Sequence, residues 1–233
     1  LSCGICHPLD QGRDGINIGE GCGVFVLESR EHVLQRKAGI YAQCVSCAMG
    51  NEAFHITSPS PDGGGFFDSI HTALQVAALP PDELDYINLH GTGTRVNDQA
   101  ELAAVEKLYA GAAKRPYLSS LKALTGHCMG AAGALEAVLT VLCLKEQQYV
   151  PLCGVGCPIE EIGSYGNRRH PIRYAMSNSF AFAGNTASVV FAGADVEAGE
   201  TAVEKREVFL GGIGMIMPGI SGIDEVRERL WQE

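Results

Sequence analysis

Two histidines and a lysine in this sequence stand in settings that suit electrostatic or acid–base chemistry. His90 follows the apolar run 86–89 and leads directly into Gly91-Thr92-Gly93-Thr94. Glycines on both sides of Thr92 let the backbone turn sharply and come close to a ligand. The pattern predicts that a strand delivers His90 into a pocket, although a histidine after a strand is more often structural.

The second stretch places Lys122 and His127 five residues apart, just before the small-residue run 130–134 and an apolar helix that extends to about residue 144. His127 is therefore expected in a loop that enters a helix. The positive end of a helix favours neutral imidazole, which suits a hydrogen-bond donor to a developing oxyanion. The alternative is a lysine on a solvated loop beside a packed helix.

Together, these two stretches resemble the beta-ketoacyl synthases, the condensing enzymes of fatty-acid and polyketide assembly. That family carries His-Gly-Thr-Gly-Thr and Lys-x-x-x-Gly-His in the same order as this sequence. The resemblance implies a decarboxylating Claisen condensation between an acyl thioester and malonyl-carrier protein. It also implies that His90 and His127 donate hydrogen bonds to the malonyl thioester oxygen, and that Lys122 orients the histidine network. No cofactor is implied.

Other segments extend the resemblance to about residues 6–194. Segments 8–10, 13–15 and 19–23 match the family's Pro-Phe-Asp, Arg-Asp-Gly and Gly-Glu-Gly-Ala-Gly elements, with Leu9 and Cys22 as departures. Segment 178–186 matches Asn-Ser-Phe-Gly-Phe-Gly-Gly-Thr-Asn, a loop that gates the acyl pocket in the family. The resemblance implies substrate contacts from Thr92, Thr94, Phe180 and Phe182, and a structural, cation-binding site built by Asn88, Glu136, Ser177 and Asn178.

The gating loop departs from the family pattern at two glycine positions and in the order of its last two residues, Asn185 and Thr186, which the family has as Thr-Asn. Ala181 and Ala183 replace glycines that flank the matched Phe182. Because alanine lacks the backbone freedom of glycine, the loop is expected to be stiffer than in the family. In an arbitrary protein, the two aromatic residues would as readily be core residues at a strand end.

The reactive cysteine of the family stands in a Thr-Ala-Cys-Ser-Ser-type turn, and none of the nine cysteines has those neighbours. Cys128, beside His127, matches a structural position. Two functions therefore stay open: a synthase whose cysteine lies upstream of Leu1, or a non-catalytic partner subunit of the chain-length-factor type. The intact His90 and Lys122 favour the enzyme. The expected partners are acyl carrier protein and, in the complete protein, an identical or related synthase subunit.

Two cysteine pairs suggest other chemistry. Cys3, Cys6 and His7 match the haem-attachment pattern, and Cys44 and Cys47 form a second Cys-x-x-Cys, which would complete a four-thiolate zinc site with Cys3 and Cys6. Covalent haem belongs to exported proteins, and we expect no leader here. Cys44 and Cys47 fall in a strand-like run, where residues three apart point to opposite faces and cannot chelate one metal ion without a turn. We expect reduced, mostly buried thiols.

Composition indicates a globular protein of 233 residues with 46% hydrophobic and 19% charged residues. A net charge of -10 argues against nucleic acid as a partner. No apolar run is long enough for a membrane span, and no charged and apolar leader opens the chain. These features predict a cytoplasmic protein.

Alternation of strand-like and helix-like patterns predicts an α/β layered fold with a mixed or parallel sheet. Within it, Asp98 is expected to cap a helix over 98–110, with Glu101 completing a capping box. The resemblance adds a thiolase-like arrangement, incomplete here because only the end of the N-terminal half and the C-terminal half are present. The other expected elements are strands at 24–27, 40–47, 86–89, 117–118 and 187–192, and helices at 28–37 and 66–77.

The expected domain organisation has four parts. Residues 1–37 end an N-terminal synthase half, 38–195 form the C-terminal synthase domain, and 196–205 form a linker of small and charged residues. Residues 206–233 read as a strand, a glycine turn and a helix. This tail resembles the opening of a second condensing enzyme.

Overall fold

The computed structural model describes residues 1–159, 171–197, 216–217 and 220–221. The chain divides into two compact units, Leu1–Thr201 and Ala202–Glu233. The division lies inside the segment 196–205 that the sequence predicts as a linker. In the second unit, the described residues are two short antiparallel strands, β6 (Ile216–Met217) and β7 (Ile220–Ser221). The strand near 208–210 and the helix near 223–230 predicted for the tail lie outside the described residues.

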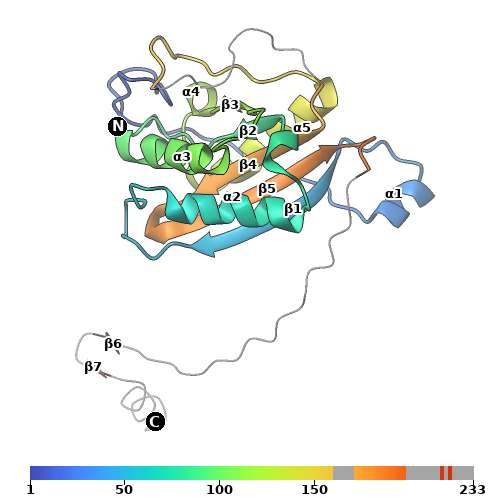
Figure 1. Cartoon of the computed structure of the whole chain (residues 1–233), viewed down its shortest axis with the longest axis horizontal. Helices are drawn as coiled ribbons and strands as arrows, with labels where there is room; N and C mark the ends of the chain where they lie inside the picture. Colours follow the sequence, from blue (N-terminus) through green and yellow to red (C-terminus); the bar gives the residue numbers. More distant parts are fainter. Residues whose placement is uncertain (160–170, 198–215, 218–219, 222–233) are drawn as a thin grey trace. The chain divides into compact units, whose positions relative to one another are not determined.

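A five-stranded mixed sheet forms the centre of the first unit, in the order β1-β5-β4-β2-β3 (Figure 1). The three strands β1, β5 and β4 pair antiparallel, whereas β2 lies parallel to both β4 and β3. The mixed sheet confirms the predicted layered α/β class. Its strands are Ala42–Asn51 (β1), Tyr86–Asn88 (β2), Tyr117–Ser119 (β3), Tyr174–Phe180 (β4) and Asn185–Gly193 (β5).

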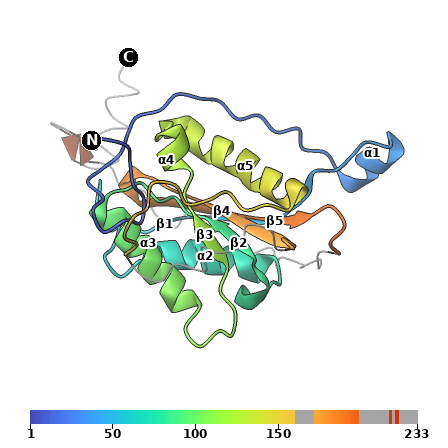
Figure 2. The same ribbon diagram turned by 90° about the horizontal axis from the view of Figure 1, so that it is seen from above.

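Helices cover both faces of this sheet, with α2 and α3 on one side and α5 on the other (Figure 2). The α-helices are Arg30–Gln35 (α1), Gly64–Val76 (α2), Arg95–Leu108 (α3), Lys122–Thr125 (α4) and Ala132–Glu146 (α5). Short 3-10 helices occupy Pro81–Glu83 (η1), Met129–Ala131 (η2) and Phe182–Gly184 (η3).

Side chains alternate along the strands and divide the core between the two faces. On β4, Met176 and Phe180 join the α2 side, whereas Ala175 joins the α5 side. Each fully buried leucine or isoleucine contributes roughly 1.5–3 kcal/mol to folding. The larger residues of the α2 side are Phe66, Ile70, Leu74, Leu84, Ile87, Leu89 and Tyr109, and those of the α5 side are Tyr86, Leu144, Tyr149, Ile172 and Phe191.

The strand predicted at 24–27 is not formed. Val24 and Val26 are 79% and 83% exposed, and the run belongs to no ladder among the described residues. The preceding glycines lie against α5, where a Cβ added to Gly23 would come within 2.6 Å of the Ala134 backbone. An apolar pattern alone does not make a strand, because a strand needs a neighbour for its backbone hydrogen bonds.

The prediction that Cys44 and Cys47 point to opposite faces is wrong. The register of β1 against β5 shifts between Cys44 and Ser46, which is a β-bulge. Cys44 lies opposite Phe191 and Cys47 lies opposite Val189, two residues apart on β5. The extra residue, Val45, therefore restores both thiols to one face of the strand.

The helix predicted at 98–110 begins earlier than expected. α3 starts at Arg95 with Thr94 as its N-cap, so Asp98 and Glu101 lie inside the helix and not at its end. Both carboxylates are fully buried, at 0% exposure. The capping-box interpretation is wrong, and the two acids are free to contact other parts of the chain.

Candidate functional site

The loop after β2 places His90 in a buried position, at 6% exposure, and the next residues turn sharply. Gly91 and Gly93 have φ angles of 40° and 75°, which favour glycine. A Cβ at Gly91 would lie 2.5 Å from the Ser120 Cβ, and a Cβ at Gly93 would lie 2.6 Å from the Cys6 sulfur. The two glycines are therefore required both by conformation and by close packing.

Two buried carboxylates of α3 hold this loop by its backbone. Glu101 accepts hydrogen bonds from the N–H groups of His90 (2.8 Å) and Gly91 (2.9 Å). Asp98 accepts from the N–H groups of Gly93 (3.2 Å) and Leu9 (2.9 Å). Both acids were interpreted as helix caps from the sequence, so their contribution to the site was missed. One signal in the sequence could have found them. Asp98 and Glu101 are spaced so that they share a helix face with the apolar Ala104 and Val105, which indicates that the two acids are buried.

Burial raises the pKa of Glu101 to about 7, and the two backbone N–H groups act against this rise. Burial also raises the pKa of Asp98, opposed by hydrogen bonds and by the charge of Arg13. Arg13 lies 3.6 Å from the Asp98 carboxylate and is itself buried. Arg13 thus compensates Asp98. The groups that donate hydrogen bonds to Glu101 are uncharged, and the charge of Lys122 favours its ionised form.

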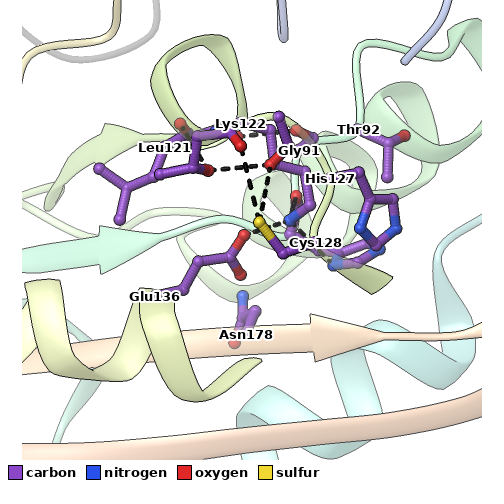
Figure 3. Close-up of polar contacts among 12 residues, drawn as sticks. Gly91, Thr92, Leu121, Lys122, His127, Cys128, Glu136 and Asn178 are labelled. Atoms are coloured by element: carbon purple, nitrogen blue, oxygen red, sulfur yellow. Dashed lines mark hydrogen bonds and ion pairs between the residues drawn. The ribbon is translucent and has the colours of Figure 1, made fainter. Parts of the chain in front are cut away.

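Lys122 begins α4 and is buried at 1% exposure, so the solvated-loop alternative is wrong. Its ammonium group lies 2.5 Å from the Glu136 carboxylate. Both residues are drawn in Figure 3. The same group donates to the His90 carbonyl oxygen and lies 3.4 Å from His90 Nδ1. One lysine therefore connects helix α5 with both the backbone and the ring of His90.

The contacts of the two rings select the same tautomer. Lysine only donates, so Nδ1 of His90 accepts from Lys122; Nδ1 of His127 accepts from the Met129 backbone N–H at 3.2 Å. Each neutral ring then carries its proton on Nε2. Burial, together with the charge of Lys122, lowers the pKa of His127, and the pKa of His90 lies well below its usual range for the same reasons.

His127 is half-buried and stands before η2 and α5, in the loop position that the sequence predicts. Its backbone N–H donates to the Asn17 carbonyl (2.7 Å), and its carbonyl accepts from the Gly19 N–H (3.1 Å). The rings of His90 and His127 lie 5.5 Å apart between centroids, nearly perpendicular at 83°. The structure therefore brings Lys122 and the two histidines into one cluster.

The predicted substrate-contacting residues occupy different environments. Thr92 is buried, and its hydroxyl lies 2.8 Å from that of Thr94. Phe180 is buried against Phe66 and lies 6.0 Å from the His90 ring. Phe182 is 74% exposed and does not join the cluster.

The residue after Phe182 is conformationally strained. Ala183 has a φ of 62°, a region that disfavours residues with a Cβ. Its N–H donates to the Ile56 carbonyl at 2.6 Å, and its carbonyl accepts from Asn51 at 2.7 Å. Segment 51–56 thus holds the Phe182 loop in a backbone conformation that a glycine would adopt more easily.

Three of the four predicted cation-site residues converge between the sheet and α5. Asn88 and Ser177 are register partners on β2 and β4, and Glu136 comes from α5. The Ser177 hydroxyl is buried without a hydrogen-bond partner among the described residues, and the Asn88 amide and Oε2 of Glu136 make no well-formed hydrogen bond there. Asn88 lies near enough to Glu136 to act against the rise of its pKa, so these two side chains face each other. Buried polar atoms normally have partners, and these oxygen donors are ligands that hard cations prefer. The three residues therefore fit an oxygen-bound cation.

The Asn178 side chain does not belong to this group. It follows Ser177 on β4, so its side chain points to the α2 side of the sheet. There it donates to Glu101 at 3.3 Å and accepts from Ser188 at 2.9 Å.

Cys128 is buried, and its sulfur packs against the carbonyl groups of Thr125 and Gly126. A Cβ at Gly19 would also lie 3.1 Å from this sulfur. These contacts suit a packing role.

Comparison with protein families matches residues 41–155 to the family described as "Beta-ketoacyl synthase, C-terminal domain". The chain contains a beta-ketoacyl synthase C-terminal domain. The match includes His90, Lys122, His127 and Glu136. It ends before Ser177 and Phe182.

Relatives of this synthase domain extend the match beyond those residues. The 3-oxoacyl-[acyl-carrier-protein] synthase 2 of Staphylococcus aureus is 38% identical over 190 residues, which are 80% of this chain and 47% of that protein. The chain thus spans about half the length of the curated relatives it matches.

Solved structures of ketosynthases share the fold of the domain. The ishigamide ketosynthase/chain length factor superposes with a TM-score of 0.77 at 35% identity, over 83% of this chain and 48% of that one. A type II polyketide ketosynthase in complex with its acyl carrier protein and bound to a hexaketide gives 0.76 at 34% identity, over 82% and 48%. The layered fold predicted from the resemblance is confirmed. No helix in the described part of this chain has the length and apolar character needed to cross a membrane.

Proposed function

We propose that the complete protein is a beta-ketoacyl-acyl carrier protein synthase, which condenses an acyl thioester with malonyl-carrier protein. The observation that carries this proposal is the pair of neutral imidazoles, 5.5 Å apart, each with its Nδ1 occupied as an acceptor. Such rings present Nε2–H donors without adding positive charge. The ring spacing is compatible with one thioester oxygen held by both donors.

The reaction begins with an acyl group held as a thioester on a cysteine supplied by the rest of the protein. The malonyl C–C bond breaks, carbon dioxide leaves, and the electron pair forms an enolate on the carrier-bound thioester. His90 and His127 donate hydrogen bonds to the enolate oxygen as its charge develops. Each such preorganised donor is worth on the order of 3 kcal/mol of barrier.

The enolate carbon then attacks the acyl carbonyl carbon. A new C–C bond forms, the C–S bond to the cysteine breaks, and the cysteine leaves as a thiolate. The product is a 3-oxoacyl group on the carrier protein. Lys122 contributes by fixing the His90 ring, and its charge adds to burial, the larger cause, in keeping the pKa of both rings low and the rings neutral.

Asn88, Glu136 and Ser177 would hold a cation beside this lysine. The cation would supply positive charge next to Glu136, whose other oxygen already faces Lys122. Together the lysine and the cation would balance the buried carboxylate and keep the base of the histidine cluster rigid.

The expected partners are acyl carrier protein and a second synthase subunit, identical or related. A ketosynthase in complex with acyl carrier protein and ketosynthases with chain length factors are among the similar structures, which supports these partners. The alternative, a non-catalytic partner subunit, has no chemical need for two tautomer-fixed histidines.

Two substitutions in the complete protein test the proposal. His90→Ala and His127→Ala should each lower malonyl-carrier protein decarboxylation by about 10²- to 10³-fold, because each removes one oxyanion donor. Transfer of the acyl group onto the cysteine should stay near the parent level, which provides the internal control. Release of labelled carbon dioxide and acyl labelling of the protein measure the two steps. A parent protein that neither decarboxylates nor condenses would refute the enzyme assignment and favour the partner subunit.

A further inference from the structure

A chain of buried polar side chains crosses the α2 side of the sheet, where the surroundings are otherwise apolar. Ser69 on α2 donates to Ser188 on β5 at 3.1 Å, and Ser188 donates to Asn178 on β4 at 2.9 Å. Asn178 and Ser188 are directly paired across the two strands. Their neighbours Met176, Phe180 and Val190 all belong to the apolar core on this side.

The hydrogen bonds fix the orientation of the Asn178 amide. Its oxygen accepts from Ser188, and its N–H₂ group faces Oε1 of Glu101 at 3.3 Å. A carboxylate oxygen can only accept, so the amide cannot turn around without losing both bonds. Asn178 and Ser188 are both 0% exposed, so water does not replace these bonds.

This series of hydrogen bonds ends at the backbone N–H of His90. The Glu101 oxygen that meets Asn178 also accepts from the His90 N–H, and its second oxygen accepts from Gly91. All three partners of Glu101 are donors, so the arrangement is satisfied only while the carboxylate is ionised. A protonated Glu101 would direct an O–H at one of these donors and loosen the loop.

We propose that Asn178 is a positioning residue that holds Glu101 in place and, through Glu101, sets the position of His90. Ser188 and Ser69 anchor the Asn178 amide to β5 and α2. The inference concerns the placement of the loop, and its effect on turnover rests on the proposed synthase function.

Three charged or titratable groups face Glu101 from the surrounding elements. Asp98 on α3 opposes its ionisation, Lys122 on α4 favours it, and His90 after β2 is neutral because its pKa is strongly lowered. The polar side chains that β4 and α2 contribute to this hydrogen-bond network are Asn178 and Ser69, and neither of them titrates. Removal of the Asn178 donor should therefore make Glu101 harder to ionise.

The direct test is a pH titration of the His90 and Gly91 amide resonances in the 15N-labelled full chain. The parent should show a transition near neutral pH, because Glu101 titrates there. Asn178→Leu, which keeps a similar volume, should move the midpoint to higher pH by about 1 unit, the effect of one lost bond to a charged group. Ser188→Ala should shift it in the same direction by less.

Ser46→Ala provides a matched control. Ser46 is a buried serine on the same face of the sheet, and its hydroxyl donates to the Ala73 carbonyl on α2 at 2.7 Å, without contact to Asn178. This variant should leave the midpoint unchanged. Equal shifts in Ser46→Ala and Ser188→Ala, or no shift in folded variants of both Ser188 and Asn178, would overturn the proposal.

Turnover supplies a second readout. In the complete protein, Asn178→Leu should lower kcat for malonyl decarboxylation by about tenfold or more, with KM changed by less than about twofold, since the histidine is misplaced and the carrier-protein surface is not. A parent without any decarboxylation would refute the synthase function, whereas the amide titration would still decide the role of Asn178. An unchanged kcat together with a shifted midpoint would overturn the link between loop position and turnover.

Discussion

The loops that carry His90 and Phe182 leave neighbouring parallel strands, β2 and β4, at the same edge of the sheet, yet they are held in opposite ways. His90 is 6% exposed and Phe182 is 74% exposed. The first loop uses glycine at both positive-φ positions, whereas the second has Ala183 at a φ of 62°. The first loop is thus built to stay in place, and the second is held in a strained state by segment 51–56.

This contrast suits the two tasks that the proposed chemistry needs. A developing oxyanion requires donors that do not move, because reorganisation would cost energy during the reaction. A contact of Phe182 with the acyl substrate, which the resemblance implies, would need no such rigidity. The difference can be tested by perturbing each loop in turn.

The largest effect is expected from Lys122→Met. It leaves the buried Glu136 carboxylate without its cationic partner, so the free energy of unfolding should fall by about 3–5 kcal/mol. Phe182→Ala, at the exposed loop, should change it by less than about 1 kcal/mol. Urea denaturation measures both. Recovery of stability in the double variant Lys122→Met/Glu136→Gln is expected, and its absence would mean that the lysine acts by packing alone.

A pH effect of intermediate size is expected from Glu101. Its folded pKa of about 7 lies above the ordinary value of 4.5, so the folded state keeps a proton that the unfolded state releases between these pH values. Stability should therefore fall by up to about 3 kcal/mol as pH rises from 4.5 to 7, and level off above that.

In Glu101→Gln, the free energy of unfolding should not show this fall between pH 4.5 and 7. Urea unfolding at several pH values measures it. The variant should also be less stable than the parent above pH 7, because its amide offers only one acceptor to two backbone N–H groups. Parallel slopes in the parent and the variant would assign the pH dependence to other groups.

The smallest effects are expected from exchanging glycine and alanine at one positive-φ position in each loop. The free energy of unfolding should fall in the His90 loop and rise in the Phe182 loop. Gly91→Ala should destabilise the protein by about 2 kcal/mol, because the new Cβ would lie 2.5 Å from Ser120 at a positive φ. Ala183→Gly should stabilise it by about 1 kcal/mol or less, since the strain at φ 62° is relieved. Thermal unfolding of the two variants compares them, and a destabilised Ala183→Gly would show that the loop is not strained.

Local sequence patterns predicted most of the elements and the loop positions of His90 and His127, whereas the joint action of the two histidines came from the family resemblance. The glycines around Thr92 and the small residues after His127 are visible within a few positions. Asp98 and Glu101 were assigned to a helix cap, since nothing local shows that α3 begins at Arg95. Their true partners are backbone N–H groups of a loop, which only the folded chain brings near.

Two other differences have the same origin. The bulge at Val45 depends on pairing with β5, which lies far along the chain, so alternation alone placed Cys44 and Cys47 on opposite faces. The run 24–27 has the composition of a strand, but composition does not supply a pairing partner. Conversely, the exposure of Phe182 could not be read from a motif that names only residue types.

The two histidines are fixed by contacts of very different sequence separation, and this predicts an order of assembly. His90 is held by Glu101, which is only 11 residues away. His127 is held by the backbone of Asn17 and Gly19, which lie near the N-terminus and are separated from His127 in sequence by more than a hundred residues. Closing the longer loop loses more chain entropy, and contacts of this kind form late in folding. The His90 side of the site should therefore assemble first during folding, and the His127 side should be the first to open under mild denaturant.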